Sequence, residues 1–285
     1  MNNIKQSSEQ AGRTKKSGET PDMCESMLDI HHLYFSYQTE PPLFEGIDLH
    51  ISPAEFVGII GPNGAGKSTL IKLIGGLLEP AQGHILLDQK PIHSFPRKEL
   101  ARMIGYVPQS VDLVFDFIVH EIVKMGRYPY LRGLLHEDDG DQAQVASALE
   151  RMDLVELQNR PFSALSGGEK QRVIIASVLA QQANILLLDE PTSSLDLKHQ
   201  QSIYRILKKL SREERKTVII VTHDINLAAQ FCERLILLNK GAVLADGPPD
   251  QVLQFQLIQK VYGVKVYIDV NPFTNSLYII PFDTQ

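Results

Sequence analysis

The chain has 285 residues, a formal net charge of −6, and a composition of 43% hydrophobic and 22% charged residues. These values are those of a folded globular protein, large enough for one α/β domain or two modest ones. The acidic balance argues against a protein that coats nucleic acid, and no apolar run approaches the ~20 residues that span a bilayer. Any membrane-crossing part of its function would therefore belong to other chains.

The beginning of the chain changes character near Met27. Residues 1–25 are rich in Ser, Gln, Lys, Gly and Thr, and such a segment buries too little surface to offset its ordering entropy, which predicts a disordered tail. The runs LDIHHLYFSY and LFEGIDLHI flank a Pro-Pro turn and predict paired antiparallel strands. Neighbouring strand residues point to opposite faces, so His31 and His32 are not expected to share a metal. Cys24 and Cys232 lie far apart in sequence and are interpreted as reduced thiols of a cytosolic protein.

The rest of the chain alternates apolar strands with helices. Strand patterns are found in EFVGII (55–60), HILLDQKPI (84–92), MIGYVPQ (103–109), NILLLDE (184–190) and TVIIVTHD (217–224). Helical patterns begin after Lys67, recur within about 111–161, and extend from Ser166 to about Gln182. A further predicted helix places four apolar residues on one stripe, namely Ile203, Ile206, Leu207 and Leu210. Short strands and turns are predicted beyond Arg234. Fully apolar strands alternating with helices imply a mainly parallel sheet covered on both faces.

The segment GPNGAGKS at 61–68 fits the phosphate-binding pattern G-x-x-x-x-G-K-[ST], between a predicted strand and a predicted helix. Its glycines let the backbone turn N–H groups inward at the positive end of a helix dipole. Lys67 would supply a positive charge to the β- and γ-phosphates, and the Ser68 hydroxyl would ligate Mg²⁺. The residues predicted to bind nucleotide here are Gly61, Pro62, Asn63, Gly64, Ala65, Gly66, Lys67, Ser68 and Thr69.

Two acids follow the apolar run ILLL, at the carboxyl end of a predicted buried strand. Ligand sites of open α/β sheets lie at such strand ends. Asp189 suits the Mg²⁺ hydration shell, and Glu190 suits a general base that activates water. The alternative is a merely solubilising edge.

The segment LSGGEKQR at 165–172 predicts a second anion site. Ser166 would cap the following helix, while Gly167 and Gly168 would let a phosphate approach the backbone. One ATP has a single terminal phosphate, so two anion sites on one chain are best used when two chains face each other head to tail. A well-capped helix without a ligand is the alternative.

The ordered set GPNGAGKST, VPQ, LSGGEKQR, ILLLDEP, SSLD and VTHD resembles the ATP-binding cassette of ABC transporters over about residues 28–250. The resemblance implies an α/β fold of the P-loop NTPase type, with a mainly parallel core sheet, an antiparallel β subdomain and an inserted helical subdomain at about 105–165. The cassette would occupy 26–265, and 266–285 would be a C-terminal strand and turn extension of the same domain. ATP and Mg²⁺ are the implied cofactors, and ATP hydrolysis is the implied activity.

The resemblance also implies roles for individual residues. Tyr37 would stack on adenine, although a half-buried strand aromatic is its alternative. Gln109 would contact Mg²⁺ and sense a membrane subunit, and His223 would contact the γ-phosphate and hold the attacking water and Glu190, although a lone histidine is more often structural. Asp196 would link the two sites across the dimer. The residues clamping the γ-phosphate bound to the opposite subunit would be Ser166, Gly167, Gly168 and Glu169; the catalytic set would be Glu190, His223 and Lys67; and the metal set would be Ser68, Gln109 and Asp189.

Three further segments, VKMGRYPYLRG (123–133), HDINLAAQFCERLILLNKGAVLADGPPDQVL (223–253) and VYGVKVYI (261–268), resemble cassettes of importers for iron–siderophores, haem and cobalamin. For GRYPY the alternative is a tight turn with packed aromatics, and zinc or manganese importers share parts of this region. An importer cassette implies a homodimer on the cytoplasmic face of the inner membrane, two permease subunits, a substrate-binding protein and no nucleic acid. The rival hypotheses are a soluble ABC ATPase without transport and a nucleotide-dependent regulatory module.

Overall fold

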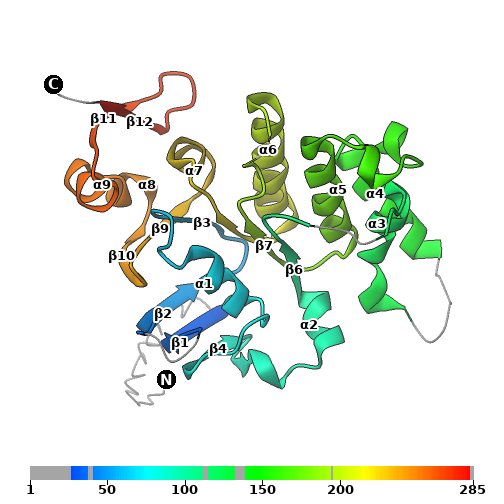
Figure 1. Cartoon of the computed structure of the whole chain (residues 1–285), viewed down its shortest axis with the longest axis horizontal. Helices are drawn as coiled ribbons and strands as arrows, with labels where there is room; N and C mark the ends of the chain where they lie inside the picture. Colours follow the sequence, from blue (N-terminus) through cyan, green and yellow to red (C-terminus); the bar gives the residue numbers. More distant parts are fainter. Residues whose placement is uncertain (1–26, 38–40, 112–114, 132–138, 194, 283–285) are drawn as a thin grey trace, which may run out of the picture.

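The computed structural model describes residues 27–37, 41–111, 115–131, 139–193 and 195–282, so the predicted tail and Cys24 lie outside the described residues. The core is a six-stranded sheet in the order β10-β9-β3-β8-β7-β6 (Figure 1). Its strands are β3 (Phe56–Ile60), β6 (Ile104–Val107), β7 (Ile185–Asp189), β8 (Thr217–Val221), β9 (Arg234–Asn239) and β10 (Ala242–Gly247). Five of these strands pair in parallel and β10 pairs antiparallel to β9, which confirms the predicted mainly parallel sheet.

A second, antiparallel sheet has the order β2-β1-β4-β5. Its strands are β1 (Leu28–Phe35), β2 (Phe44–Ile51), β4 (Gln82–Leu87) and β5 (Lys90–Pro91). The predicted pairing of the first two runs is confirmed, but the regular alternation assumed for His31 and His32 is wrong. A bulge interrupts the register there, His32 adopts a φ of 46°, and both imidazoles are exposed.

Helix α1 (Lys67–Ile74) lies between the two sheets and shares one hydrophobic cluster with both. Leu70 and Leu73 of α1, together with Ile30 of the small sheet and Ile59 of the core sheet, belong to this cluster and are almost fully buried. Because α1 begins where the phosphate loop ends, this packing fixes the loop between two rigid layers.

The other face of the core sheet is covered by helices α5 (Gly167–Ala180), α6 (Leu197–Glu214) and α7 (Ile225–Phe231). The predicted stripe of α6 is confirmed, since Ile203, Leu207 and Leu210 are each 1% exposed. Helices α3 (Val119–Met125) and α4 (Asp139–Arg151) pack beside α5 at one end of the molecule, and α2 (Arg97–Met103) precedes β6. Single 3₁₀ turns lie at Ile92–Ser94, Tyr128–Tyr130, Val155–Leu157 and Phe162–Ala164.

The prediction of only strands and turns beyond Arg234 is wrong. Helices α8 (Pro249–Val252) and α9 (Phe255–Tyr262) follow β10, and the hairpin β11 (Lys265–Val270) and β12 (Leu277–Phe282) comes after them. Ile258, Val261 and Tyr262 have helical spacing and pack on the core, and Gly263 ends α9 in the left-handed region. The signal was therefore present, but a helix of only eight residues shows little more than one period of it.

The GRYPY segment holds the helical part of the molecule together. A Cβ added to Gly126 would lie 1.9 Å from the Ser177 carbonyl oxygen of α5, so only glycine allows this approach. The Arg127 side chain donates through Nε to Asp141 of α4 at 2.7 Å and through a terminal nitrogen to the Ala180 carbonyl at 2.7 Å. Its guanidinium also stacks 3.9 Å from the Tyr130 ring centroid. Most of the motif is thus structural, whereas Tyr128 is 71% exposed.

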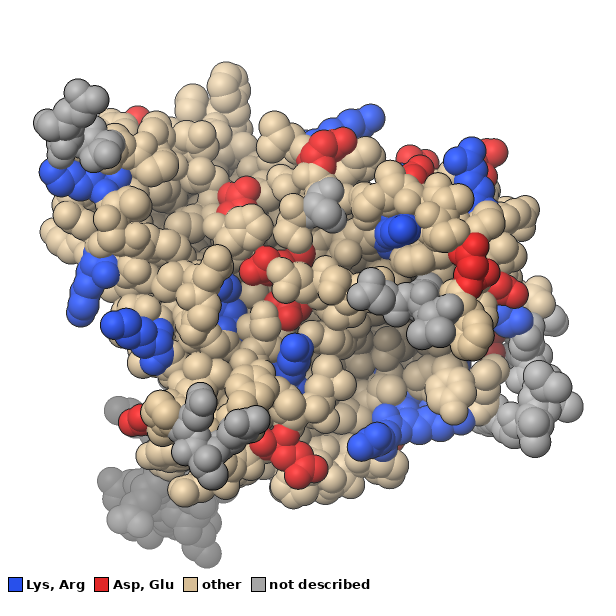
Figure 2. Space-filling model, in the orientation of Figure 1, with Lys and Arg blue, Asp and Glu red and all other residues tan. Residues whose placement is uncertain are grey.

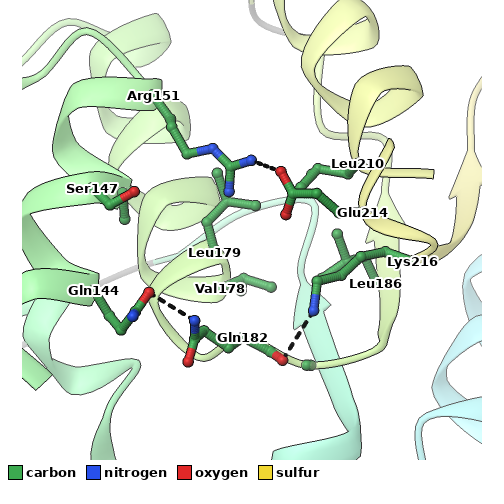
Figure 3. A pocket seen from close by; sticks show the side chains of 12 residues that line it. Gln144, Ser147, Arg151, Val178, Leu179, Gln182, Leu186, Leu210, Glu214 and Lys216 are labelled. Carbon is green, nitrogen blue, oxygen red and sulfur yellow. Dashed lines mark hydrogen bonds and ion pairs between the residues drawn. The ribbon is translucent and has the colours of Figure 1, made fainter. Parts of the chain in front are cut away.

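A small pocket of about 100 Å³ marks the junction of α4 with the core (Figure 3). Arg151 of α4 forms an ion pair with Glu214 at the end of α6. The Gln182 side chain donates to Gln144 of α4 at 2.7 Å, and the Gln182 backbone carbonyl accepts from Lys216 at 3.1 Å. The Arg151 and Gln144 contacts add polar links to the apolar packing of α4, whose Val145, Ala148 and Leu149 are buried in the main hydrophobic cluster.

On the face drawn in Figure 2, basic and acidic side chains are interspersed and most of the surface is uncharged. Among the described residues, no helix is both long and apolar enough to cross a membrane.

Candidate functional site

The phosphate loop lies between β3 and α1, where the sequence places it. Gly61 and Gly66 have φ values of 149° and 101°, and a Cβ on either would lie within 3 Å of a neighbour, namely the Leu238 carbonyl oxygen or the Phe44 ring. Lys67 is 5% exposed, and its ammonium donates to the Gly61 and Pro62 carbonyls at 2.9 and 3.0 Å. Burial lowers the pKa of Lys67, while the charges of Glu190 and Asp189 oppose this shift. The loop is therefore already curled around a buried cation.

Asp189 ends β7 and is 2% exposed, which excludes the alternative of a solubilising edge. One of its oxygens accepts from the Ser68 hydroxyl at 2.8 Å, and the Tyr106 hydroxyl lies 3.5 Å from the other. Burial raises the pKa of Asp189, and burial together with the Asp189 charge raises the pKa of Tyr106. Tyr106 thus stays protonated and can donate. Its part in the site was missed, because no local pattern relates this strand tyrosine to Asp189, which lies 83 positions away in the chain.

Glu190 follows β7 directly and adopts a φ of 48°, a left-handed conformation that costs a non-glycine residue about 1–3 kcal/mol. Its backbone N–H donates to the Val221 carbonyl of β8 at 3.0 Å, which ties this turn to the neighbouring strand. Its carboxylate accepts from Gln109 Nε2 at 3.1 Å and lies 3.5 Å from His223 Nδ1. The structure therefore brings together three predicted site residues from the ends of three adjacent strands.

An open cleft of about 840 Å³ lies over the phosphate loop. Tyr37 lines it, is 61% exposed, and shares a hydrogen bond of 2.9 Å between its hydroxyl and the Thr69 hydroxyl. Lys240 also lines the cleft and was missed by the sequence prediction. It sits in the β9–β10 turn, whose Gly241 N–H donates to the Ala65 carbonyl at 3.1 Å. The lining residues are Ser36, Tyr37, Pro41, Pro42, Leu43, Asn63, Gly64, Gly66, Lys67, Ser68, Thr69, Gln109, Glu190 and Lys240.

The LSGGEKQR segment begins α5 as predicted. Ser166 and Glu169 form a capping box, in which the Glu169 carboxylate accepts from the Ser166 N–H at 2.8 Å and Ser166 Oγ accepts from the Glu169 N–H at 3.3 Å. Hydrogen bonds from Ser166 lower the pKa of Glu169. A Cβ on Gly167 would meet no atom of the described residues within 4 Å, so they leave the space beside this helix terminus open.

Asp196 caps α6 instead of pointing into the cleft. Its carboxylate accepts from the His199 N–H at 2.9 Å and lies 2.8 Å from the His199 ring nitrogen, and these contacts lower the pKa of Asp196. Neither Asp196 nor the capping box of α5 lines the cleft of its own chain. The structure thus separates the predicted residues into one group around the cleft and a second group outside it.

Similar proteins give the family. A model of the ABC transporter family matches residues 44–193. The hemin import ATP-binding protein HmuV of Streptomyces coelicolor is 40% identical over 84% of this chain and 85% of its own length. The ferric enterobactin transport ATP-binding protein FepC of Escherichia coli is 37% identical over 83% of this chain and 88% of its own.

Two solved structures agree with these sequence relatives. An inward-facing metal-chelate type ABC transporter has a TM-score of 0.79 and 28% identity, covering 91% of this chain and 98% of that one. A dimeric ATP-binding cassette bound to ADP and Pi has a TM-score of 0.71 and 33% identity, covering 78% of this chain and 99% of that one. Because the family match spans both the phosphate loop and the acids that end β7, the chain belongs to the ABC transporter family as an ATP-binding, ATP-hydrolysing subunit.

Proposed function

We propose that this protein drives the import of a metal chelate, namely an iron–siderophore, haem or cobalamin. It works as a homodimer on the cytoplasmic face of the inner membrane, beneath two permease subunits that a substrate-binding protein supplies, and it binds no nucleic acid. The observation that carries the proposal is the similarity over more than four fifths of the chain to import proteins for hemin and ferric enterobactin. These similarities do not favour a soluble ABC ATPase or a zinc or manganese importer.

Two copies complete each reaction centre. Phosphoryl transfer requires donors around the γ-phosphate, because charge spreads over its equatorial oxygens. The cleft offers Lys67 from one side, while the open α5 terminus at Ser166 belongs to a different surface of the same chain. A head-to-tail pair places the Ser166–Glu169 segment of one copy over the cleft of the other, with Asp196 close to the shared boundary.

Within one cleft, the ring of Tyr37 stacks on adenine and Lys67 exchanges its carbonyl partners for phosphate oxygens. Mg²⁺ fits the oxygen donors of Ser68, Asp189 and Gln109, since hard cations prefer hydroxyl, carboxylate and amide oxygens. When bound, the ion neutralises charge on the β- and γ-phosphate oxygens. Gln109 donates to Glu190 through its nitrogen, which leaves its amide oxygen as the atom that would ligate the ion.

Glu190 then accepts a proton from the attacking water, and His223 holds the γ-phosphate and the carboxylate in line. Closure of the dimer around ATP adds the Ser166–Glu169 segment of the other copy to this set, and loss of the γ-phosphate removes the charge that holds the copies together. The interface is thus a two-state element that ATP biases. The helical subdomain, residues about 105–165, carries this motion to the permeases.

Replacement of Glu190 by glutamine tests the assembly. Glu190→Gln is expected to bind ATP normally, to lose about 10²–10⁴-fold in turnover as removal of a general base does, and to accumulate as a dimer with Mg-ATP. Light scattering and a phosphate-release assay measure both effects. The matched control is Glu156→Gln, an exposed glutamate remote from the cleft, which should turn over normally. A Glu190→Gln protein that stays monomeric at saturating Mg-ATP refutes the composite site.

Two further measurements separate the parts of the proposal. Lys67→Ala should weaken ATP binding itself, and unchanged affinity for ATP would refute the proposed binding of nucleotide by the phosphate loop.

Uptake of radiolabelled haem, ferric siderophore and cobalamin by cells expressing the chain with its permease tests the cargo. If none of the three is taken up while ATP is hydrolysed, the cargo class is wrong and the ATPase assignment stands.

A further inference from the structure

The C-terminal hairpin β11–β12 lies outside the nucleotide cleft, yet it is hydrogen-bonded to the helix that follows His223. Its inner face is anchored, since Val266 and Ile279 are 3% and 5% exposed and join the main hydrophobic cluster. Ile268 and Leu277 pack against the same cluster. The hairpin is therefore a fixed part of the core and can serve as a support for neighbouring segments.

The support is provided through one side chain, Asn226. Its Oδ1 accepts from the Ile279 N–H at 2.8 Å, and its Nδ2 donates to the Ile279 carbonyl at 3.2 Å. These two groups belong to the edge of β12 that faces away from β11, and among the described residues no strand pairs with that edge. The Asn226 amide thus takes the place of one residue of a third strand. Both of its polar atoms form hydrogen bonds with the Ile279 backbone, and Ile279 is buried.

Asn226 lies in the first turn of α7, three residues after His223. The intervening segment is held by local contacts, in which the Asp224 N–H donates to Thr222 Oγ1 at 3.1 Å and the Asp224 carboxylate accepts from the Leu227 N–H at 2.9 Å. His223 itself is 58% exposed, so packing does little to fix its ring. Its direction toward Glu190, 3.5 Å away, is therefore set by the backbone between β8 and the start of α7.

We propose that Asn226 is a positioning residue for ATP hydrolysis: by clamping the first turn of α7 to β12, it fixes the direction of His223 toward Glu190 and the γ-phosphate. The inference rests on the role proposed above for His223. A shift of about 1 Å in a catalytic group can cost up to 10²-fold in rate, so two hydrogen bonds that set a helix start are enough to matter.

The test is a mutant cycle on the full-length chain, followed by single-turnover phosphate release so that low residual rates are measurable. Asn226→Ala is expected to lower the maximal rate about tenfold while KM for Mg-ATP stays within about twofold. Asn226→Asp keeps the acceptor for the Ile279 N–H but sets a carboxylate oxygen against the Ile279 carbonyl, so it should be no faster than Asn226→Ala. On a His223→Ala background, Asn226→Ala should lower the rate no further, because the residue acts through His223.

The control is Asn271→Ala, the same substitution in the same hairpin. Asn271 Oδ1 accepts from the Phe273 and Thr274 N–H groups in the turn and does not contact α7, so its loss should leave turnover normal. Thermal unfolding of each variant shows that the chain is folded.

Normal turnover of Asn226→Ala would overturn the inference. The inference would also fail if Asn226→Ala lowered the rate by the same factor on the His223→Ala background as on the unmodified protein, because that result indicates a general structural effect. A fully active His223→Ala refutes the role of His223 and this inference with it. An impaired His223→Ala together with an active Asn226→Ala refutes this inference alone.

Discussion

Replacement of Arg127 by methionine tests whether the GRYPY segment holds the helical subdomain together. The Arg127 side chain is 8% exposed and that of its partner Asp141 is 14% exposed. Methionine keeps most of the apolar stem but removes the charge, the two short hydrogen bonds and the stacking on Tyr130. The change leaves a buried carboxylate without its cation and the Ala180 carbonyl without its donor.

Breaking a buried ion pair from one side costs about 3–5 kcal/mol, and the partial access of water to Asp141 places this case at the lower end, at about 3 kcal/mol. For a chain of this size, each kcal/mol lowers the unfolding temperature by about 2–4 °C, so we expect a decrease of about 6–12 °C. The double variant Arg127→Met/Asp141→Leu removes both charges and should recover at least about half of the loss.

Calorimetry or fluorescence-monitored unfolding of the apo protein measures these shifts. The control is Arg212→Met, which removes an ion pair with Glu233 whose side chains are 61% and 41% exposed and which contributes at most about 1 kcal/mol. An Arg127→Met protein that unfolds at the same temperature as Arg212→Met would refute the structural role of the motif. A double variant less stable than Arg127→Met would refute the explanation by an unpaired charge.

Three other predictions follow from the cleft and from the packing of α3. Lys240→Ala should raise KM for Mg-ATP about fivefold in a steady-state ATPase assay, the effect of losing one contact of about 1 kcal/mol, whereas the exposed Lys260→Ala should not. Burial raises the pKa of Asp189 in the folded chain. Above this raised pKa the ionised Asp189 carboxylate destabilises the fold, and the destabilisation disappears as the pH falls through that pKa and the carboxylate becomes protonated. Asp189→Asn should therefore lose turnover yet unfold at a higher temperature than the unmodified protein at pH 8 without Mg²⁺, with a smaller difference in acid; a lower unfolding temperature at pH 8 would contradict this. Gly126→Ala, whose Cβ would meet backbone at 1.9 Å, should cost about 3 kcal/mol or more in unfolding experiments. Gly140→Ala, whose Cβ would meet none of the described residues within 4 Å, should be neutral or stabilising.

Local hydrogen-bonding motifs and the spacing of hydrophobic residues were sufficient to predict a large part of the structure from the sequence. The phosphate loop, the parallel strands, the stripe of α6 and the Ser166 cap all depend on residues within a few positions of one another, and each was predictable. The exceptions also have local causes. A bulge at His32 broke the two-residue alternation, and α9 was too short to show a clear helical period.

Contacts between distant segments were decided by the tertiary structure. Tyr106 meets Asp189 across 83 positions, and Asn226 meets Ile279 across 53, because parallel strands and a returning hairpin bring their ends together. Lys240 enters the cleft for the same reason. Residue spacing along the sequence does not predict such long-range contacts, because they depend on strand order and register, which many residues determine together. The sequence by itself determined the phosphate loop, the two acids after β7 and the capped start of α5, because each depends on neighbouring residues. The fold added Tyr106 and Lys240 to the site and placed the α5 terminus outside the cleft of its own chain.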